Sequence, residues 1–196
     1  MTTRSMTAVA CLLAFAAMMS ASAPRAARAD PVEGKAALCG ACHGGNGVPA
    51  NKAIPILWGQ NEGYIYLQLR DYKLGNRKNP SMSAIARGLE KPDMQALAAY
   101  FADKPWGNLQ QPRATSDAAH RAESINDSGG CKGCHLDAWQ GDSATPRVGG
   151  QSLPYLRQTM LQFRNGERAN NPWMTALLKT YTDEDIDALA SYLAGL

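Results

Sequence analysis

The chain has 196 residues, of which 45% are hydrophobic and 19% charged, so a disordered tail or a multi-span membrane protein is excluded. Lys and Arg number 20 against 17 Asp and Glu, but three of the arginines lie in the first 29 residues, which hold no acidic side chain. Beyond that segment the two signs balance at 17 each, which disfavours a strongly basic nucleic-acid-binding protein.

Residues 1–29 have the features of a secretory signal peptide in the usual order. Arg4 supplies a positive start, residues 8–19 form a short apolar run, and Ala27-Arg28-Ala29 is a small-x-small cleavage sequence. The apolar run is too short to cross a bilayer as a helix of the mature protein. We expect cleavage after Ala29 and location in a bacterial periplasm, and an uncleaved N-terminal anchor is the alternative.

The first helix is expected from Asp30-Pro31, which suits an N-cap and a first-turn proline, up to a cluster of cysteines. With Cys11 in the signal peptide, the four remaining cysteines form two CxxCH sequences: Cys39, Cys42 and His43, and Cys131, Cys134 and His135. Positions i, i+3 and i+4 of a helix share a face, so two thiols can attach to the two vinyl groups of a haem while the adjacent imidazole reaches its iron. The pattern is typical of c-type haem attachment.

Three other functions of the four cysteines are compatible with parts of the pattern. Two disulfides would suit an oxidising compartment, and four thiolates or a mixture of thiolates and imidazoles can hold zinc. Neither requires a His directly after both pairs. A redox-active CxxC would be expected once, within a βαβ pattern that is not visible here.

The remaining elements occur twice, because the sequence contains an internal repeat. The two CxxCH sequences are 92 residues apart, and each haem-attachment His is followed 39 residues later by a Met in an Asn-Pro-x-Met setting. Between these anchors the offset is 91 residues and relates the following pairs: Pro55 and Pro146, Gly59-Gln60 and Gly150-Gln151, Tyr64 and Tyr155, and Arg77 and Arg168. The chain is therefore a duplicated module.

Met82 and Met174 are the predicted second ligands of the two irons, because they lie at equal distances from His43 and His135. The preceding proline favours an extended loop that carries the thioether over the far face of the porphyrin. His/Met ligation is typical of cytochromes c and raises the reduction potential. His120 has no counterpart in the first half and is read as a surface residue, with bis-His ligation as the alternative.

The sequence predicts an all-α fold. Residues 44–59 are expected to form a loop, 64–75 a middle helix and 92–102 a last helix with Met94, Leu97, Ala98 and Phe101 toward the core. In the second half Ser116-Asp117 caps a helix that weakens at Gly129-Gly130, and helices follow at 155–163 and 182–193. Residues 104–116 are the expected linker. Each half has about 80 residues, a size at which an apolar core is marginal, so a buried porphyrin is expected to complete it.

These features together resemble the two-haem cytochrome c4 family: two CxxCH modules, Pro-x-x-x-Gly-Gln after each, and a late Met in each. The resemblance implies two tandem class I cytochrome c domains, residues 30–103 and 117–196, each around one covalently bound haem c and related by a pseudo-twofold axis. It also implies that the carbonyls of Pro55 and Pro146 accept hydrogen bonds from the haem histidines.

Function follows from the ligand set, because an iron bound by both His and Met has no open position for a substrate. We expect a one-electron carrier rather than an enzyme, which similarity to the family places between a respiratory donor complex and a terminal oxidase. One alternative is the two-haem subunit of a dehydrogenase, such as a flavocytochrome that oxidises sulfide. Another is an enzyme in its own right with an unusual ligand at one haem. Attachment to the membrane surface stays open.

Overall fold

The computed structural model describes residues 31–196, so the predicted signal peptide of residues 1–29 lies outside the described residues. The described part is helical and contains no β-sheet, only an isolated bridge between Asp142 and Thr145. Its helices are α1 (Pro31–His43), α2 (Glu62–Leu74), α3 (Pro80–Arg87), α4 (Lys91–Ala102), α5 (Ser116–Gly129), α6 (Lys132–His135), α7 (Leu153–Arg164), α8 (Pro172–Leu178) and α9 (Asp183–Ala194).

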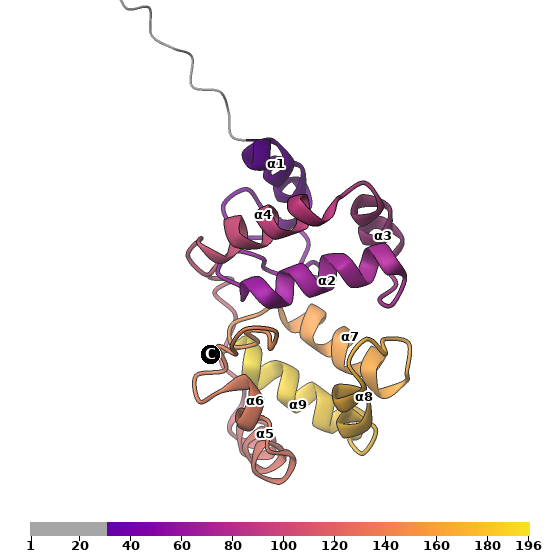
Figure 1. The fold of residues 1–196 in the computed structure, drawn as a ribbon. Helices are drawn as coiled ribbons and strands as arrows, with labels where there is room; N and C mark the ends of the chain where they lie inside the picture. The colour runs from indigo at the N-terminus through magenta and orange to yellow at the C-terminus, as the bar shows by residue number, and fades with distance from the viewer. Residues whose placement is uncertain (1–30) are drawn as a thin grey trace, which may run out of the picture.

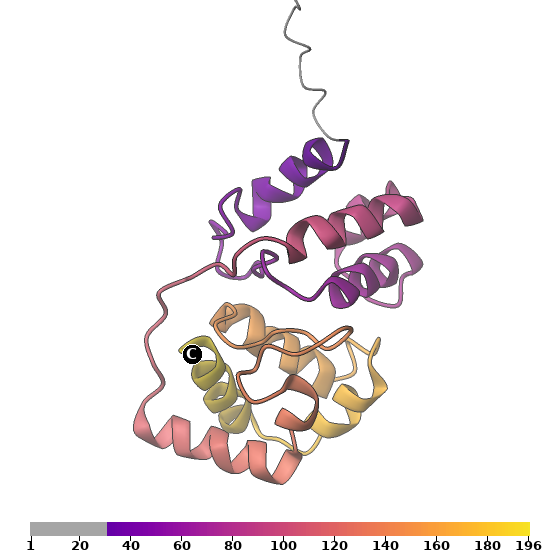
Figure 2. The ribbon, with the colours of Figure 1, turned by 60° about the vertical axis from the view of Figure 1, so that its left-hand side comes forward.

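The helices form two groups that lie one above the other (Figure 1). In the first group α4 packs against α1 and α2, and α2 also packs against α3. In the second group α9 packs against α5 and α7, and α7 packs against α8. The segment between α4 and α5 runs along the outside of both groups (Figure 2). The predicted all-α class is confirmed.

The helix ends follow from local sequence. Gly75 ends α2 in the left-handed conformation, with φ of 79°, where glycine carries no steric penalty. The last helices α4 and α9 each begin with a reciprocal capping box, in which the carboxylate of Asp93 or Asp185 accepts the backbone N–H three residues before it. In α5 the cap is Thr115, one residue before the predicted Ser116.

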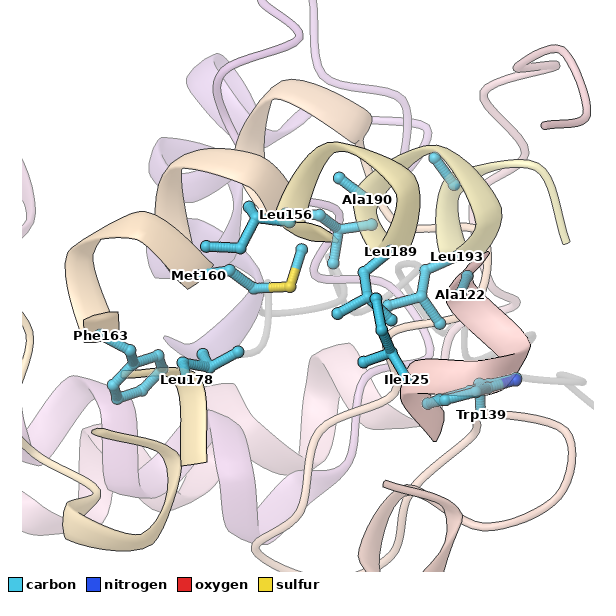
Figure 3. Packing of buried hydrophobic residues seen from close by; sticks show 12 residues of the cluster. Ala122, Ile125, Trp139, Leu156, Met160, Phe163, Leu178, Leu189, Ala190 and Leu193 are labelled. Atoms are coloured by element: carbon cyan, nitrogen blue, oxygen red, sulfur yellow. The ribbon is translucent and has the colours of Figure 1, made fainter. Parts of the chain in front are cut away.

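Each group has its own apolar core. The second contains Trp139, Met160 and Phe163 among the side chains of α5, α7 and α9 (Figure 3). The first contains the predicted residues of α4, and Met94 and Leu97 are 4% and 1% exposed. The prediction that Met94 faces the core is confirmed, and Met160 of the second half is buried as well.

The prediction of extended loops around Met82 and Met174 is wrong. Both residues lie in the first turn of a helix, α3 or α8. Asn79 and Asn171 are the N-caps of these helices, and their side chains accept the backbone N–H groups of Met82 and Met174 at 3.0 and 3.2 Å. The Asn-Pro pair is thus an N-cap followed by a first-turn proline, a combination that starts helices.

The segment that joins the two groups is tied down. The guanidinium of Arg147 lies 4.6 Å from the centre of a Trp106 ring. Gln111 donates to the carbonyls of Gln151 and Ala194, at 2.9 and 3.1 Å, and accepts from the N–H of Leu153. The predicted linker therefore packs on the second group and does not hang free between the two.

Among residues 31–196, none of the helices has the length and apolar character that a membrane span requires.

Candidate metal centre

The first CxxCH forms the last turns of α1. Cys39, Cys42 and His43 occupy positions i, i+3 and i+4 of one helix and therefore share a face. Cys39 is half-buried, Cys42 is exposed and His43 is buried. Burial raises the pKa of the Cys39 thiol.

The second CxxCH is presented differently. Helix α5 stops at Gly130, which adopts the left-handed conformation with φ of 62°, and the separate short helix α6 carries Cys134 and His135. The predicted weakness at Gly129-Gly130 is therefore a complete break. Burial raises the pKa of the Cys131 thiol as it does that of the corresponding thiol in the first half.

Both histidines are held by a proline carbonyl, as the family resemblance implies. His43 Nδ1 lies 2.9 Å from the carbonyl oxygen of Pro55, and His135 Nδ1 lies 3.0 Å from that of Pro146. A carbonyl oxygen only accepts, so Nδ1 carries the proton in each ring and Nε2 keeps its lone pair. Burial lowers the pKa of both imidazoles, although the bond to the proline carbonyl acts in the opposite direction. Each ring is thus held neutral, in the form in which Nε2 can bind a metal ion.

The two late methionines lie on the same cores as the cysteines. Met82 and Cys39 both pack against the buried cluster of the first half, and Met174 and Cys131 both pack against that of the second. All four are partly buried. The paired placement is the same in both halves, which is what equivalent ligands require.

The alternatives considered for the cysteines and for the third histidine find no support in residues 31–196. No disulfide joins any two of the four cysteines Cys39, Cys42, Cys131 and Cys134. Within this part of the chain, no three or more His, Cys, Asp or Glu side chains are grouped so as to hold a metal ion. His120 is exposed on α5, as expected of a surface residue.

The sequence repeat did not reveal how the two halves interlock. Arg77 of the first half donates to the hydroxyl of Tyr155 in the second at 3.1 Å, and Arg168 of the second donates to that of Tyr64 in the first at 3.2 Å. These are equivalent residues of the repeat, so the interface has approximate twofold symmetry. Both guanidinium groups are buried and, within residues 31–196, neither is paired with a carboxylate.

The two buried guanidinium groups change the pKa of a tyrosine at this interface. Burial alone would raise the pKa of Tyr155, but the guanidinium groups of Arg77 and Arg168 outweigh it and lower this pKa to about 7. Such a region favours a negatively charged group. The donor set of each centre, with two thiols, a neutral imidazole and a thioether, fits a covalently attached haem.

This fold and these paired centres define a class: c-type cytochromes with two haems. A family model described as "Cytochrome C oxidase, cbb3-type, subunit III" matches residues 117–193. Cytochrome c4 of Azotobacter vinelandii is 34% identical over 84% of this chain and 87% of its own length. The chain belongs to the cytochrome c4 family, which carries two c-type haems and transfers electrons rather than catalysing a reaction.

Two further relatives are informative. The crystal structure of reduced recombinant cytochrome c4 from Pseudomonas stutzeri matches with a TM-score of 0.75 and 32% identity, over 84% of this chain and 96% of that one. The thiosulfate dehydrogenase electron acceptor of Stutzerimonas stutzeri strain A1501 is 30% identical over 82% of this chain and 80% of its length. The expected tandem arrangement of class I cytochrome c domains is thereby confirmed.

Proposed function

We propose that Cys39 and Cys42 attach one haem and Cys131 and Cys134 the other. His43 and Met82 are then the axial ligands of the first iron, and His135 and Met174 those of the second. Residues 30–103 and 117–196 are the two haem domains, with residues 104–116 between them. The duplicated sequence, the matched hydrogen bonds of the two histidines and the matched positions of the two methionines support this assignment.

The observation that carries the function is the pairing of a His and a Met in both halves. A haem bound in this way supplies one-electron redox chemistry at high potential. The histidines are oriented by Pro55 and Pro146, and the methionines by the capped first turns of α3 and α8. With both axial positions occupied, no position is left for a substrate, so the protein relays electrons between partners.

The compartment and the partners are those that the predicted signal peptide and membership of the cytochrome c4 family imply. After removal of residues 1–29 the protein works in the periplasm, where it takes electrons from a quinol-oxidising respiratory complex and passes them to a terminal oxidase. Similarity of residues 117–193 to an oxidase subunit supports the second half as the exit domain.

The ligand assignment is tested with four methionine variants of the haem-loaded protein. Met82→Leu and Met174→Leu should each remove the optical signature of Met–iron ligation from one of two haems and lower its potential. The matched controls Met94→Leu and Met160→Leu replace core methionines and should leave both haems unchanged. Fewer than two haems per chain by pyridine haemochrome assay, or full Met–iron absorbance in Met82→Leu or Met174→Leu, would contradict the assignment.

A second function is favoured by one comparison, the similarity to a thiosulfate dehydrogenase electron acceptor. In that case the first electron donor is a dehydrogenase rather than a quinol-oxidising complex. Stopped-flow reduction by each purified donor separates the two. Rapid reduction by the quinol-oxidising complex and slow reduction by the dehydrogenase is expected, and the reverse order would favour the second function.

A further inference from the structure

Two buried glutamines cross the interface and bind the backbone of the opposite half. Gln151 accepts the N–H of Ile56 at 2.9 Å and donates to the carbonyl of Ile56 at 3.1 Å. Gln60 accepts the N–H of Arg147 at 2.7 Å and donates to the carbonyl of Arg147 at 2.9 Å. The glutamines are 2% and 3% exposed, and they are equivalent residues of the repeat.

The orientation of each side-chain amide is determined by its partners. Oε1 of Gln151 also accepts the N–H of Ser152 at 2.8 Å, and Oε1 of Gln60 accepts the N–H of Asn61 at 2.9 Å. Because each oxygen receives two backbone donors, the opposite amide orientation would place NH₂ against N–H. Each glutamine is therefore locked in one position.

The peptide group that each glutamine binds is the one that holds a haem histidine. The N–H of Ile56 belongs to the same peptide as the carbonyl of Pro55, which accepts from His43. A chain of hydrogen bonds thus runs from Gln151 through one peptide group to His43. The equivalent chain runs from Gln60 through the Pro146–Arg147 peptide to His135.

Hydrogen bonds in such a chain polarise one another. When the N–H of a peptide donates, negative charge increases on its carbonyl oxygen, which becomes a better acceptor for Nδ1–H. A stronger bond at Nδ1 makes the ring a better electron donor at Nε2 and favours the oxidised iron. Each glutamine therefore acts on the histidine, and through it on the iron, of the opposite half.

We propose that Gln60 and Gln151 are positioning residues, each of which tunes the reduction potential of the haem in the opposite half through its histidine. Each potential then depends on the docking of both halves. The proposal rests on the proposed function, because it takes His43 and His135 as iron ligands. The bonds of the glutamines are not the only ones between the halves in the described residues, since the crossed Arg–Tyr pairs also join them.

The test uses Gln151→Leu and Gln60→Leu in the full-length, haem-loaded protein. Redox titration followed by NMR reports each haem separately through its methyl signals. Gln151→Leu should raise the potential of the first-half haem and Gln60→Leu that of the second, each shifting one redox equilibrium by about three- to tenfold, the usual weight of one hydrogen bond. Faster solvent exchange of the Nδ1 proton should occur in the same half as the shifted haem.

Asn61→Ala and Ser152→Ala are the matched controls. Their side chains also cross the interface, to the carbonyls of Thr145 and Lys52, but they do not contact a peptide that holds a histidine. Both variants should leave the two potentials unchanged. Gln151→Glu keeps the oxygen acceptor and should remain closer to the unsubstituted protein than Gln151→Leu, which guards against a variant that merely folds poorly.

Several results would overturn the proposal. These are a shift in the haem of the substituted half, equal shifts in both haems, shifts of the same size in the control variants, or no shift at all. A failure of the proposed function is distinguishable, because it would be visible in the unsubstituted protein as a missing haem or missing His/Met ligation.

Discussion

In each half one tryptophan packs within the loop that follows the CxxCH sequence. This tryptophan comes from the end of the loop in the first half and from its beginning in the second. In the first half Trp58 lies over Gly47, so that a Cβ on Gly47 would be 2.9 Å from the ring. In the second half the equivalent residues are exchanged. Trp139 occupies the position of Gly47, and Gly149, where a Cβ would be 3.2 Å from Trp139, occupies that of Trp58.

The backbone path is nevertheless the same. The residue directly after the haem histidine has φ of 85° as Gly44 and 63° as Leu136. Three residues later φ is 81° at Gly47 and 57° at Trp139. In the first half glycine adopts the left-handed conformation at both positions. In the second half two larger residues adopt it, and the strain costs about 1–3 kcal/mol of stability for each of them.

The hydrogen bond between the proline carbonyl and the CxxCH histidine is the same in both halves. The loop must deliver a proline carbonyl to the histidine, and both halves do so within 0.1 Å of the same distance, 2.9 and 3.0 Å. The side chain that fills the loop is exchangeable as long as one indole remains. The second half also has the larger contiguous cluster of buried apolar residues, with twelve against eight.

The largest difference between the halves is expected when haem attachment is removed. Cys39→Ala/Cys42→Ala should unfold most of the first half, because its smaller core depends more on the porphyrin. Cys131→Ala/Cys134→Ala should leave more of the second half folded. Far-UV circular dichroism and hydrogen exchange of each half measure the outcome. An unchanged first-half fold would contradict the dependence on haem.

The exchanged tryptophan gives the next largest effect. Trp139→Gly should lower the free energy of unfolding by about 3 kcal/mol, because a buried indole is lost without replacement. Trp139→Gly/Gly149→Trp restores the arrangement of the first half and should recover more than half of that loss. Denaturant titration of the haem-loaded protein measures both. A double variant no more stable than Trp139→Gly would show that the two loops are not equivalent.

A smaller effect separates backbone conformation from crowding. Gly47→Ala should cost about 2–3 kcal/mol, because it combines a left-handed φ with a contact that is too close to Trp58. Gly75→Ala has a similar φ of 79° but no atom within 4 Å, so only about 1 kcal/mol is expected. Thermal unfolding curves compare the two. Equal losses of stability in the two variants would show that crowding against Trp58 does not add to the cost of Gly47→Ala.

The smallest effect concerns a feature that both halves share. Asp93 of α4 forms an ion pair with Lys35 of α1. Asp185, which also caps α9, forms an ion pair with Arg121 of α5. Each carboxylate therefore joins the last helix of its half to the first helix of that half. The bond from Lys35 lowers the pKa of Asp93, and the backbone N–H of Thr182 does so first for Asp185. Because both carboxyl pKa values are below those of the unfolded chain, the stability that they provide is present above about pH 4 and is lost as the pH falls further.

Asp93→Asn and Asp185→Asn test this pH dependence. Each variant should be less stable than the unsubstituted protein at pH 7 and should lose less stability on acidification to about pH 3. Denaturant midpoints across this range report the change. A slope against pH that is the same with and without the carboxylates would rule out their contribution.

The type of cofactor and most of the local structure can be predicted from the amino-acid sequence alone. Two CxxCH sequences at a fixed offset predicted the duplicated centres, and helical periodicity together with capping residues predicted six of the nine helices described in residues 31–196. The short helices α3 and α8 were not predicted, because the proline of Asn79-Pro80 and Asn171-Pro172 is compatible both with extended backbone and with the first turn of a capped helix. Such patterns are readable because they depend on residues close together in the chain.

The way in which the two halves pack together is visible only in the folded molecule. Gln60, Gln151, Arg77 and Arg168 were visible as repeated residues, but nothing local shows that each reaches across to the opposite half. The separations involved are 78 to 95 residues for the bonds of Arg77, Gln60 and Gln151. Contacts over such distances depend on how two complete cores dock, and docking is set by the shape and polarity of whole surfaces rather than by any short segment.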